Sequence, residues 1–204
     1  MKIASHNSFT YLRPRRWWMR PFAFMARCQR VNWVEQWAKY GADLFDLRVR
    51  IDTKARQPYF CHGLMRFEGS VWARLGDMNK QSRANNDSIF VRVVLEDNKP
   101  TAEEIALFQE FCRFIEMCFL HLRFFGGNDR SDWGCRHPYY KFKTPAQDVD
   151  DKYSSTTTLF PRGFKWLRYL DDLCPILYAR LHNRRNIERG TSHVWLFIDF
   201  VDIR

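Results

Sequence analysis

The chain has 204 residues, of which 46% are hydrophobic and 17% aromatic, so it can bury a core and general disorder is excluded. It contains no run of about 18 apolar residues, which excludes a transmembrane helix. Lysine and arginine number 33 against 23 aspartate and glutamate, and this net charge of +10 favours anionic partners such as nucleic acid, acidic lipid or phosphate esters.

The N-terminus and the cysteines indicate where the protein works. Polar residues begin at Ser5 and His6, which leaves no room for the apolar part of a signal peptide, so we expect a cytoplasmic protein without a leader. The six cysteines show neither a CxxC pair nor metal-finger spacing, and we expect free thiols. We expect one domain over residues 1–204, because no linker-like stretch divides the chain.

Alternating and helical patterns follow one another along the chain. The clearest strand is 43–51, where apolar Phe45, Leu47 and Val49 alternate with polar residues. Residues 126–163 are polar and show no period, so we expect a long irregular loop, which is often functional or mobile. We expect strands at 2–6, 43–51, 59–62, 89–96, 119–125 and 193–201, and helices at 31–40, 70–80, 100–118 and 163–182, the last broken or kinked at Pro175.

Strands separated by helices are typical of an α/β protein. A complete (β/α)8 barrel would have only about 25 residues per unit in a chain of this length, at the lower limit for that fold. We therefore expect a small, irregular or distorted (β/α)8 barrel of the TIM type.

Polar side chains stand where the predicted strands end or inside otherwise apolar strands. In parallel α/β folds the carboxyl ends of the strands meet at the functional face, so we expect these side chains in one pocket. Asp46 and Arg48 share one face of their strand, because they are two residues apart. The set comprises His6, Asn7, Asp46, Arg48, His62, Glu96 and Asp199.

Two histidines, an arginine and several carboxylates fit the cleavage of a phosphodiester. One histidine takes the proton of the attacking hydroxyl and the other protonates the leaving oxygen, and each transfer contributes about 100- to 10,000-fold in rate. The planar arginine fork suits the non-bridging phosphate oxygens. A carboxylate behind a histidine fixes its tautomer.

Three motifs carry a resemblance to a known family. They are Ser5–Thr10 (SHNSFT), Gly41–Val49 (GADLFDLRV) and Cys61–Gly63 (CHG). In order and spacing over residues 1–63, they resemble the opening of the phosphatidylinositol-specific phospholipase C X-domain superfamily. Weaker matches are 94–98 (VLEDN) and 198–201 (IDFV). Residues 120–190 show no match.

The resemblance implies a role for each matching residue. His6 would be the general base and His62 the general acid. Arg48 would bind the phosphate, as in the metal-independent bacterial branch, while Asp199 would orient the base and Asp46 would support the arginine. The implied enzyme is a phosphoric diester hydrolase or lyase, in which a neighbouring inositol hydroxyl attacks phosphorus, diacylglycerol leaves and a cyclic phosphate remains.

The resemblance also bears on metal and substrate binding. Asn7 and Glu96 match the calcium-dependent eukaryotic branch, and both are candidates for binding the phosphate or substrate. If calcium were bound, Asn7, Asp46 and Glu96 would be its ligands. The eukaryotic site has a second carboxylate where this chain has Arg48, and a fixed cation there would repel Ca²⁺. We therefore expect no metal cofactor, with calcium as the alternative.

Residues 11–30 mix six arginines with tryptophan and phenylalanine. Such a mixture is typical of segments at a membrane surface, where tryptophan lies at the headgroup level and arginine faces anionic lipid. We expect Trp17, Trp18, Arg15 and Arg16 to make peripheral contact with an anionic membrane. Packing of the tryptophans into the core and contact with nucleic acid remain as alternatives.

The first hypothesis is thus a phosphodiesterase acting on a (glycero)phospholipid or a related phosphodiester. A rival is a non-catalytic barrel that serves as a binding or structural component of a larger assembly, although the presence of His6, Arg48 and His62 together argues against it. The charge also suggests a protein that binds or cleaves nucleic acid. We expect no nucleic-acid partner, because no recognised motif for one is present.

Overall fold

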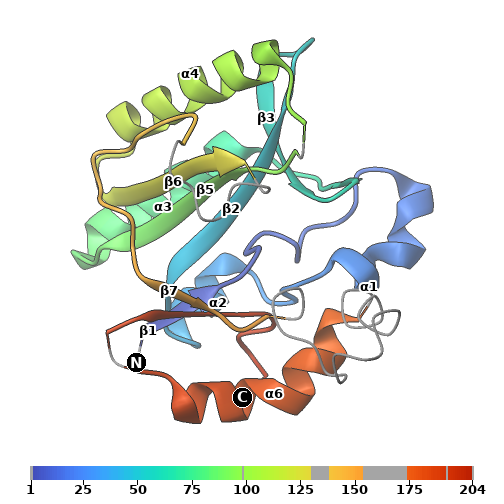
Figure 1. Cartoon of the computed structure of the whole chain (residues 1–204), viewed down its shortest axis with the longest axis vertical. Coiled ribbons are helices and arrows are strands. Elements are labelled where there is room, and N and C mark those ends of the chain that lie inside the picture. The colour runs from blue at the N-terminus through green and yellow to red at the C-terminus, as the bar shows by residue number, and fades with distance from the viewer. Residues whose placement is uncertain (1, 98, 130–137, 154–173, 192, 204) are drawn as a thin grey trace. The chain divides into compact units, whose positions relative to one another are not determined.

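The computed structural model describes residues 2–97, 99–129, 138–153, 174–191 and 193–203 (Figure 1). The chain divides into two compact units: unit 1 comprises Met1–Leu44 and Gln147–Arg204, and unit 2 comprises Phe45–Ala146. Both units contain parallel strands together with helices, so the α/β class predicted from the sequence is confirmed. In the part of the chain that the structure describes, no helix is long and apolar enough to cross a bilayer.

Unit 1 is built on parallel strands. β1 (Lys2–Ser5) pairs with β8 (Trp195–Ile198), and β8 pairs with β7 (Val149–Asp151). Apolar strand residues such as Ile3 and Phe197 are buried, so these strands contribute to the core of the unit. The helices of unit 1 are η1 (Trp17–Phe22), α1 (Ala23–Ala26), α2 (Trp33–Ala38) and α6 (Pro175–Arg189).

Two helices of unit 1 begin where local chemistry favours a start. The side chain of Asn32 accepts a hydrogen bond from the Glu35 backbone N–H and so caps α2. Helix α6 begins at Pro175, whose missing N–H costs nothing in a first turn. The predicted break or kink at Pro175 stays a prediction, because residues 163–173 of that predicted helix lie outside the described residues.

Unit 2 contains an antiparallel hairpin beside a parallel pair. β2 (Ala42–Asp52), which begins in unit 1, pairs antiparallel with β3 (Gln57–His62), and β3 pairs antiparallel with β4 (Met65–Arg66). β5 (Ile89–Leu95) pairs with β2 and runs parallel to β6 (Leu122–Asp129). β3 runs antiparallel to β2 because the short turn between them leaves no length for a crossover.

The helices of unit 2 are α3 (Val71–Asn85) and α4 (Ala102–Cys118). A capping box starts α4: the Thr101 hydroxyl accepts the Glu104 N–H, and the Glu104 carboxylate accepts the Thr101 N–H. Phe119 is the C-terminal cap of α4, so the strand predicted at 119–125 begins only at Leu122.

Two glycines shape the end of β6. Gly126 and Gly127 have φ values of +91° and +84°, in the region that favours glycine. A Cβ on Gly126 would lie 2.7 Å from the Val93 carbonyl oxygen, and one on Gly127 would lie 2.0 Å from the Tyr140 carbonyl oxygen. The register between β5 and β6 shifts here, between Val93 and Val94, as at a β-bulge. The close approach of the backbone therefore requires glycine at both positions.

The stretch 126–163, predicted as a long irregular loop, contains strand residues where the structure describes it. Within 126–163, β6 continues to Asp129 and β7 forms a short strand, while 130–137 and 154–163 lie outside the described residues.

The cysteines in the described ranges are free thiols, as predicted: Cys28, Cys61, Cys112, Cys118 and Cys174.

Candidate active site

The residues predicted to form the site fall into two clusters, one in each unit. The histidine–aspartate cluster of unit 1 contains His6, Asn7 and Asp199. The arginine–carboxylate cluster of unit 2 contains Asp46, Arg48 and Glu96, and His62 directly precedes Gly63, whose N–H binds Glu96.

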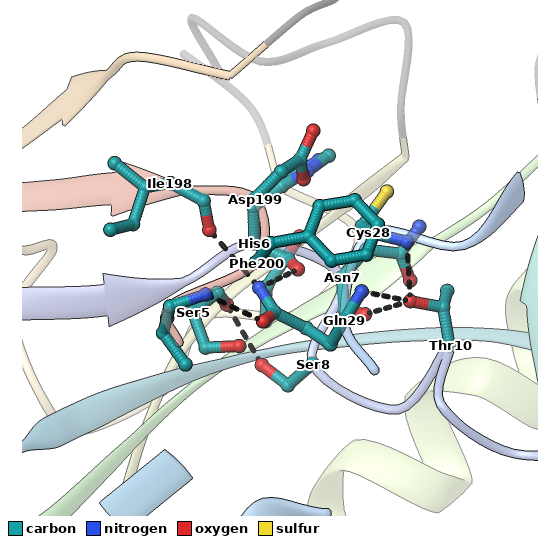
Figure 2. Close-up of polar contacts among 12 residues, drawn as sticks. Ser5, His6, Asn7, Ser8, Thr10, Cys28, Gln29, Ile198, Asp199 and Phe200 are labelled. Atoms are coloured by element: carbon teal, nitrogen blue, oxygen red, sulfur yellow. Dashed lines mark hydrogen bonds and ion pairs between the residues drawn. The ribbon is translucent and has the colours of Figure 1, made fainter. Parts of the chain in front are cut away.

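His6 and Asp199 form a buried pair. The ring nitrogen Nδ1 of His6 lies 2.6 Å from Oδ1 of Asp199, and both side chains are almost fully buried (Figure 2). The His6 backbone N–H donates to the Ile198 carbonyl at 3.0 Å, which continues the β1–β8 ladder and brings the two residues together. An ionised carboxylate only accepts hydrogen bonds, so Nδ1 carries a proton, and in the neutral ring Nε2 is then the basic nitrogen.

Buried amides hold the backbone around this pair. Nε2 of Gln29 donates to the carbonyls of His6 and Ile198, both at 3.1 Å, and its Oε1 accepts the Val201 N–H. Nδ2 of Asn183, on α6, donates to the Asp199 carbonyl at 2.7 Å. Sequence reasoning missed both amides, because neither lies in a motif or an alternating pattern.

The residues that follow His6 and Asp199 have unusual backbone conformations. Asn7 has φ +45° and Phe200 has φ +49°, so two non-glycine residues adopt the left-handed region next to the pair. Such conformations persist only where the surrounding contacts impose them, and they concentrate at functional sites. Asn7 is buried, and its conformation directs the chain away from β1 directly after His6.

An aromatic ring covers His6. The rings of Tyr153 and His6 are stacked with centroids 3.5 Å apart and an interplanar angle of 3°. Tyr153 is itself buried, so the plane of the imidazole is fixed from its face as well as from Asp199. The sequence offers no signal for this contact, because Tyr153 lies in the patternless stretch 126–163.

In unit 2, Asp46 lies between two arginines. Nε of Arg48 donates to Oδ2 of Asp46 and Nε of Arg92 donates to Oδ1, both at 2.8 Å. Nη1 of Arg48 donates to Oε2 of Glu96 at 3.3 Å. All four side chains are buried, and their charges sum to zero, which is the condition under which burial of charge is tolerated.

Glu96 connects Arg48 to the end of β3. Its other oxygen, Oε1, accepts the Gly63 N–H at 3.1 Å, so one carboxylate joins the arginine to the residue after His62. The Glu96 backbone N–H also donates to Val49 on β2. Although β3 is antiparallel to β2, these contacts bring the HG motif, Arg48 and Glu96 into one cluster.

Two neighbours of this cluster also bear on its chemistry. Arg92 was missed by sequence reasoning, yet it is detectable, since positions 92, 94 and 96 share a face of the strand predicted at 89–96. Burial raises the pKa of the Cys61 thiol well above its ordinary value, and the Glu96 carboxylate raises it further. Cys61 therefore stays neutral, as befits a core residue rather than a nucleophile.

The basic aromatic segment is exposed. Trp17 is 76% exposed and Trp18 is 49% exposed, and η1 contains no buried residue. The alternative in which these tryptophans pack into the core is therefore wrong. Arg15 and Arg16 are also exposed, and the Arg16 guanidinium lies over the Trp18 ring, 5.6 Å from its centroid.

No protein-family model and no curated protein matches the chain. Among solved structures, the chain is similar to the phosphatidylinositol-specific phospholipase C from Listeria monocytogenes, with a TM-score of 0.62 and 13% sequence identity. The similarity covers 98% of this chain and 87% of that one. At this identity it is the fold that is shared, and the fold of this chain is a distorted (β/α)8 barrel of the TIM type, as the sequence predicts.

Proposed function

We propose that the chain is a phosphodiesterase of the phosphatidylinositol-specific phospholipase C type, a phosphoric diester hydrolase or lyase. The observation that carries the proposal is the buried pair of His6 and Asp199, which leaves Nε2 of His6 as a base of fixed orientation. The similarity of fold to a phospholipase C supports it. The substrate would be a (glycero)phospholipid or a related phosphodiester.

In the proposed reaction each of the two histidines transfers one proton. Nε2 of His6 takes the proton of the attacking hydroxyl, whose oxygen forms the new bond to phosphorus. His62 gives a proton to the oxygen of the breaking P–O bond, so the alcohol leaves neutral. When the attacking hydroxyl belongs to the headgroup itself, the product is a cyclic phosphate.

Arg48 would stabilise the negative charge that gathers on the phosphate oxygens. Its guanidinium has five N–H groups, and the contacts to Asp46 and Glu96 fix its orientation by Nε and Nη1. Asn7 and Glu96 are the remaining candidates for contact with the substrate. Arg92 would act through Asp46, which it holds from the side opposite to Arg48.

The proposed reaction uses no metal cofactor. Calcium ligands would have to include Asp46 and Glu96, and both oxygens of each carboxylate already accept hydrogen bonds within unit 2. Ca²⁺ needs six to eight oxygen ligands, so these carboxylates would first have to give up their arginine and backbone partners.

The test compares single histidine variants with matched controls. His6→Ala and His62→Ala should each lower turnover of phosphatidylinositol or a glycerophosphodiester by at least about 100-fold with the fold intact. His182→Ala in unit 1 and His121→Ala in unit 2 should keep full activity, and so should the wild type in chelator. Unchanged turnover in either active-site variant would overturn the proposal.

A second candidate is a non-catalytic barrel that serves as a component of a larger assembly. Deep burial favours it, because His6 and Arg48 expose at most 3% of their surface. The same assay decides between the two, since a non-catalytic barrel turns over none of these phosphodiesters.

We also propose that the segment of η1 makes peripheral contact with an anionic membrane. Its exposed Trp17 and Trp18 can enter the headgroup region while Arg15 and Arg16 face the lipid phosphates.

Each basic residue contributes about 1 kcal/mol at such a surface, so Arg15→Gln with Arg16→Gln should weaken binding to phosphatidylserine vesicles by roughly 25-fold at low salt. The control is Phe114→Ala, which removes an exposed aromatic residue in unit 2. Equal vesicle binding by the arginine variant, or tighter binding to an oligonucleotide, would contradict this assignment.

A further inference from the structure

Three different metal-ligating side chains meet in unit 1. They are His6, Cys28 and Asp199, and their ring nitrogen, thiol sulfur and carboxylate oxygen all lie within 4.8 Å of one another. All three are labelled in Figure 2, and all three are buried. They come from segments far apart in the sequence, so the fold rather than local spacing assembles the cluster.

The position of Cys28 relative to the pair is fixed by hydrogen bonds. Its backbone N–H donates to the Thr10 hydroxyl at 2.9 Å, and its carbonyl accepts the Phe200 N–H at 2.6 Å, directly after Asp199. The next residue, Gln29, donates to the His6 carbonyl. The backbone that carries the thiol is therefore tied to both partners of the pair, which gives three donors a common geometry before any ligand arrives.

We propose that this cluster binds a thiophilic divalent cation of the zinc class. A histidine nitrogen, a thiolate and a carboxylate are the ligands that Zn²⁺ takes, whereas Ca²⁺ and Mg²⁺ prefer oxygen alone. A neutral imidazole with one thiolate and one carboxylate carries two negative charges, and these balance the cation in a buried place.

The three donor atoms are close enough to reach tetrahedral coordination after a small rearrangement. At the usual Zn–N and Zn–O lengths, two such ligands stand about 3.3 Å apart, and a nitrogen and a sulfur stand about 3.6 Å apart. If Nδ1 of His6 is the ligand, binding requires its 2.6 Å contact with Asp199 to lengthen. Three protein ligands leave a fourth position for water.

The cation would act as an inhibitor of the proposed reaction, not as its cofactor. Whichever nitrogen of His6 binds it, the imidazole loses either its contact with Asp199 or the lone pair that accepts the proton. Metal binding itself stands independently of the proposed function, because it requires no substrate.

Cobalt is the spectroscopic probe. We expect the full chain to bind Co²⁺ with a thiolate-to-cobalt charge-transfer absorption that Zn²⁺ abolishes by displacement. Because the thiol must lose its proton, binding should tighten as pH rises. Cys28→Ser and Cys28→Ala should lose the absorption and weaken Zn²⁺ binding by more than about 10-fold. Cys118→Ser, which changes an exposed thiol at the end of α4, is the matched control and should behave as wild type.

The outcomes separate this site from the phosphodiesterase. Absence of the charge-transfer band in the wild type, or its persistence in a folded Cys28 variant, would overturn the site whatever the activity. If both Cys28 variants fail to fold, replacing the other five cysteines one at a time decides: an unchanged band in all five assigns the ligand to Cys28, and loss of the band in any one overturns the proposal. Zinc binding in a chain without phosphodiesterase activity would leave the site intact and remove only the proposed function.

Discussion

The two clusters are held together in opposite ways. In unit 1, one hydrogen-bonded pair, His6 and Asp199, is surrounded by uncharged supports, of which Gln29 and Asn183 bind the backbone. In unit 2, two arginines and two carboxylates hold one another, with Asp46 at the centre. Both clusters are buried, but only the second depends on a balance of several charges.

This difference determines what a single substitution leaves behind. Removing one charge from the cluster of unit 2 leaves a buried ion without its counterion, a change that typically costs about 3–5 kcal/mol. In unit 1 the histidine can be neutral, so loss of the carboxylate leaves a hydrogen bond weakened rather than a charge uncompensated. The cluster of unit 2 should therefore matter more for stability, and that of unit 1 more for chemistry.

The largest expected effect is that of Asp46→Asn on stability. The amide keeps the shape of the side chain but faces the Nε groups of both Arg48 and Arg92 without a negative charge. We expect the free energy of unfolding, measured by denaturant titration, to fall by about 3–5 kcal/mol. Asp77→Asn, which changes an exposed carboxylate 3.6 Å from Arg74, should cost at most about 1 kcal/mol.

A second substitution tests whether uncompensated charge causes the loss of stability in Asp46→Asn. Adding Arg92→Met to Asp46→Asn removes the one excess positive charge, since Arg48 keeps its contact with Glu96, and should restore part of the lost stability. Such a rescue identifies uncompensated charge as the cause, because loss of packing would not be repaired by a further deletion. An Asp46→Asn protein as stable as the Asp77→Asn control would break the contrast between the clusters.

The elements that could be predicted are those whose signals are local. The alternation of Phe45, Leu47 and Val49 identifies β2, and Thr101 with Glu104 identifies the start of α4. The antiparallel direction of β3 could not be predicted from alternation, because pairing depends on the length of the turn. β7 was missed because three residues, two of them acidic, carry no recognisable period.

The same criterion, whether a local sequence signal exists, separates the site residues that could be predicted from those that could not. The charged members lie in motifs or at strand ends, so the sequence could nominate them. Gln29, Asn183 and Tyr153 act through contacts with residues more than 15 positions away, and nothing near them in the sequence marks those contacts. Arg92 lies between these cases, because its position on the face of Glu96 could be inferred from strand periodicity alone.

The smaller effect on stability is expected for Asp199→Asn. The amide can still hydrogen-bond to the His6 ring, so the free energy of unfolding should fall by only about 1–2 kcal/mol. If the introduced amide turns its NH₂ toward Nδ1, the ring proton moves to Nε2, and that nitrogen can no longer accept the proton of an attacking hydroxyl. Turnover should then fall by up to about 10,000-fold in a protein that unfolds nearly as the wild type does. A loss of stability as large as that of Asp46→Asn would instead mean that the His6–Asp199 pair is a structural ion pair with a charged imidazole, and the proposed base would have no lone pair to accept a proton in the resting protein.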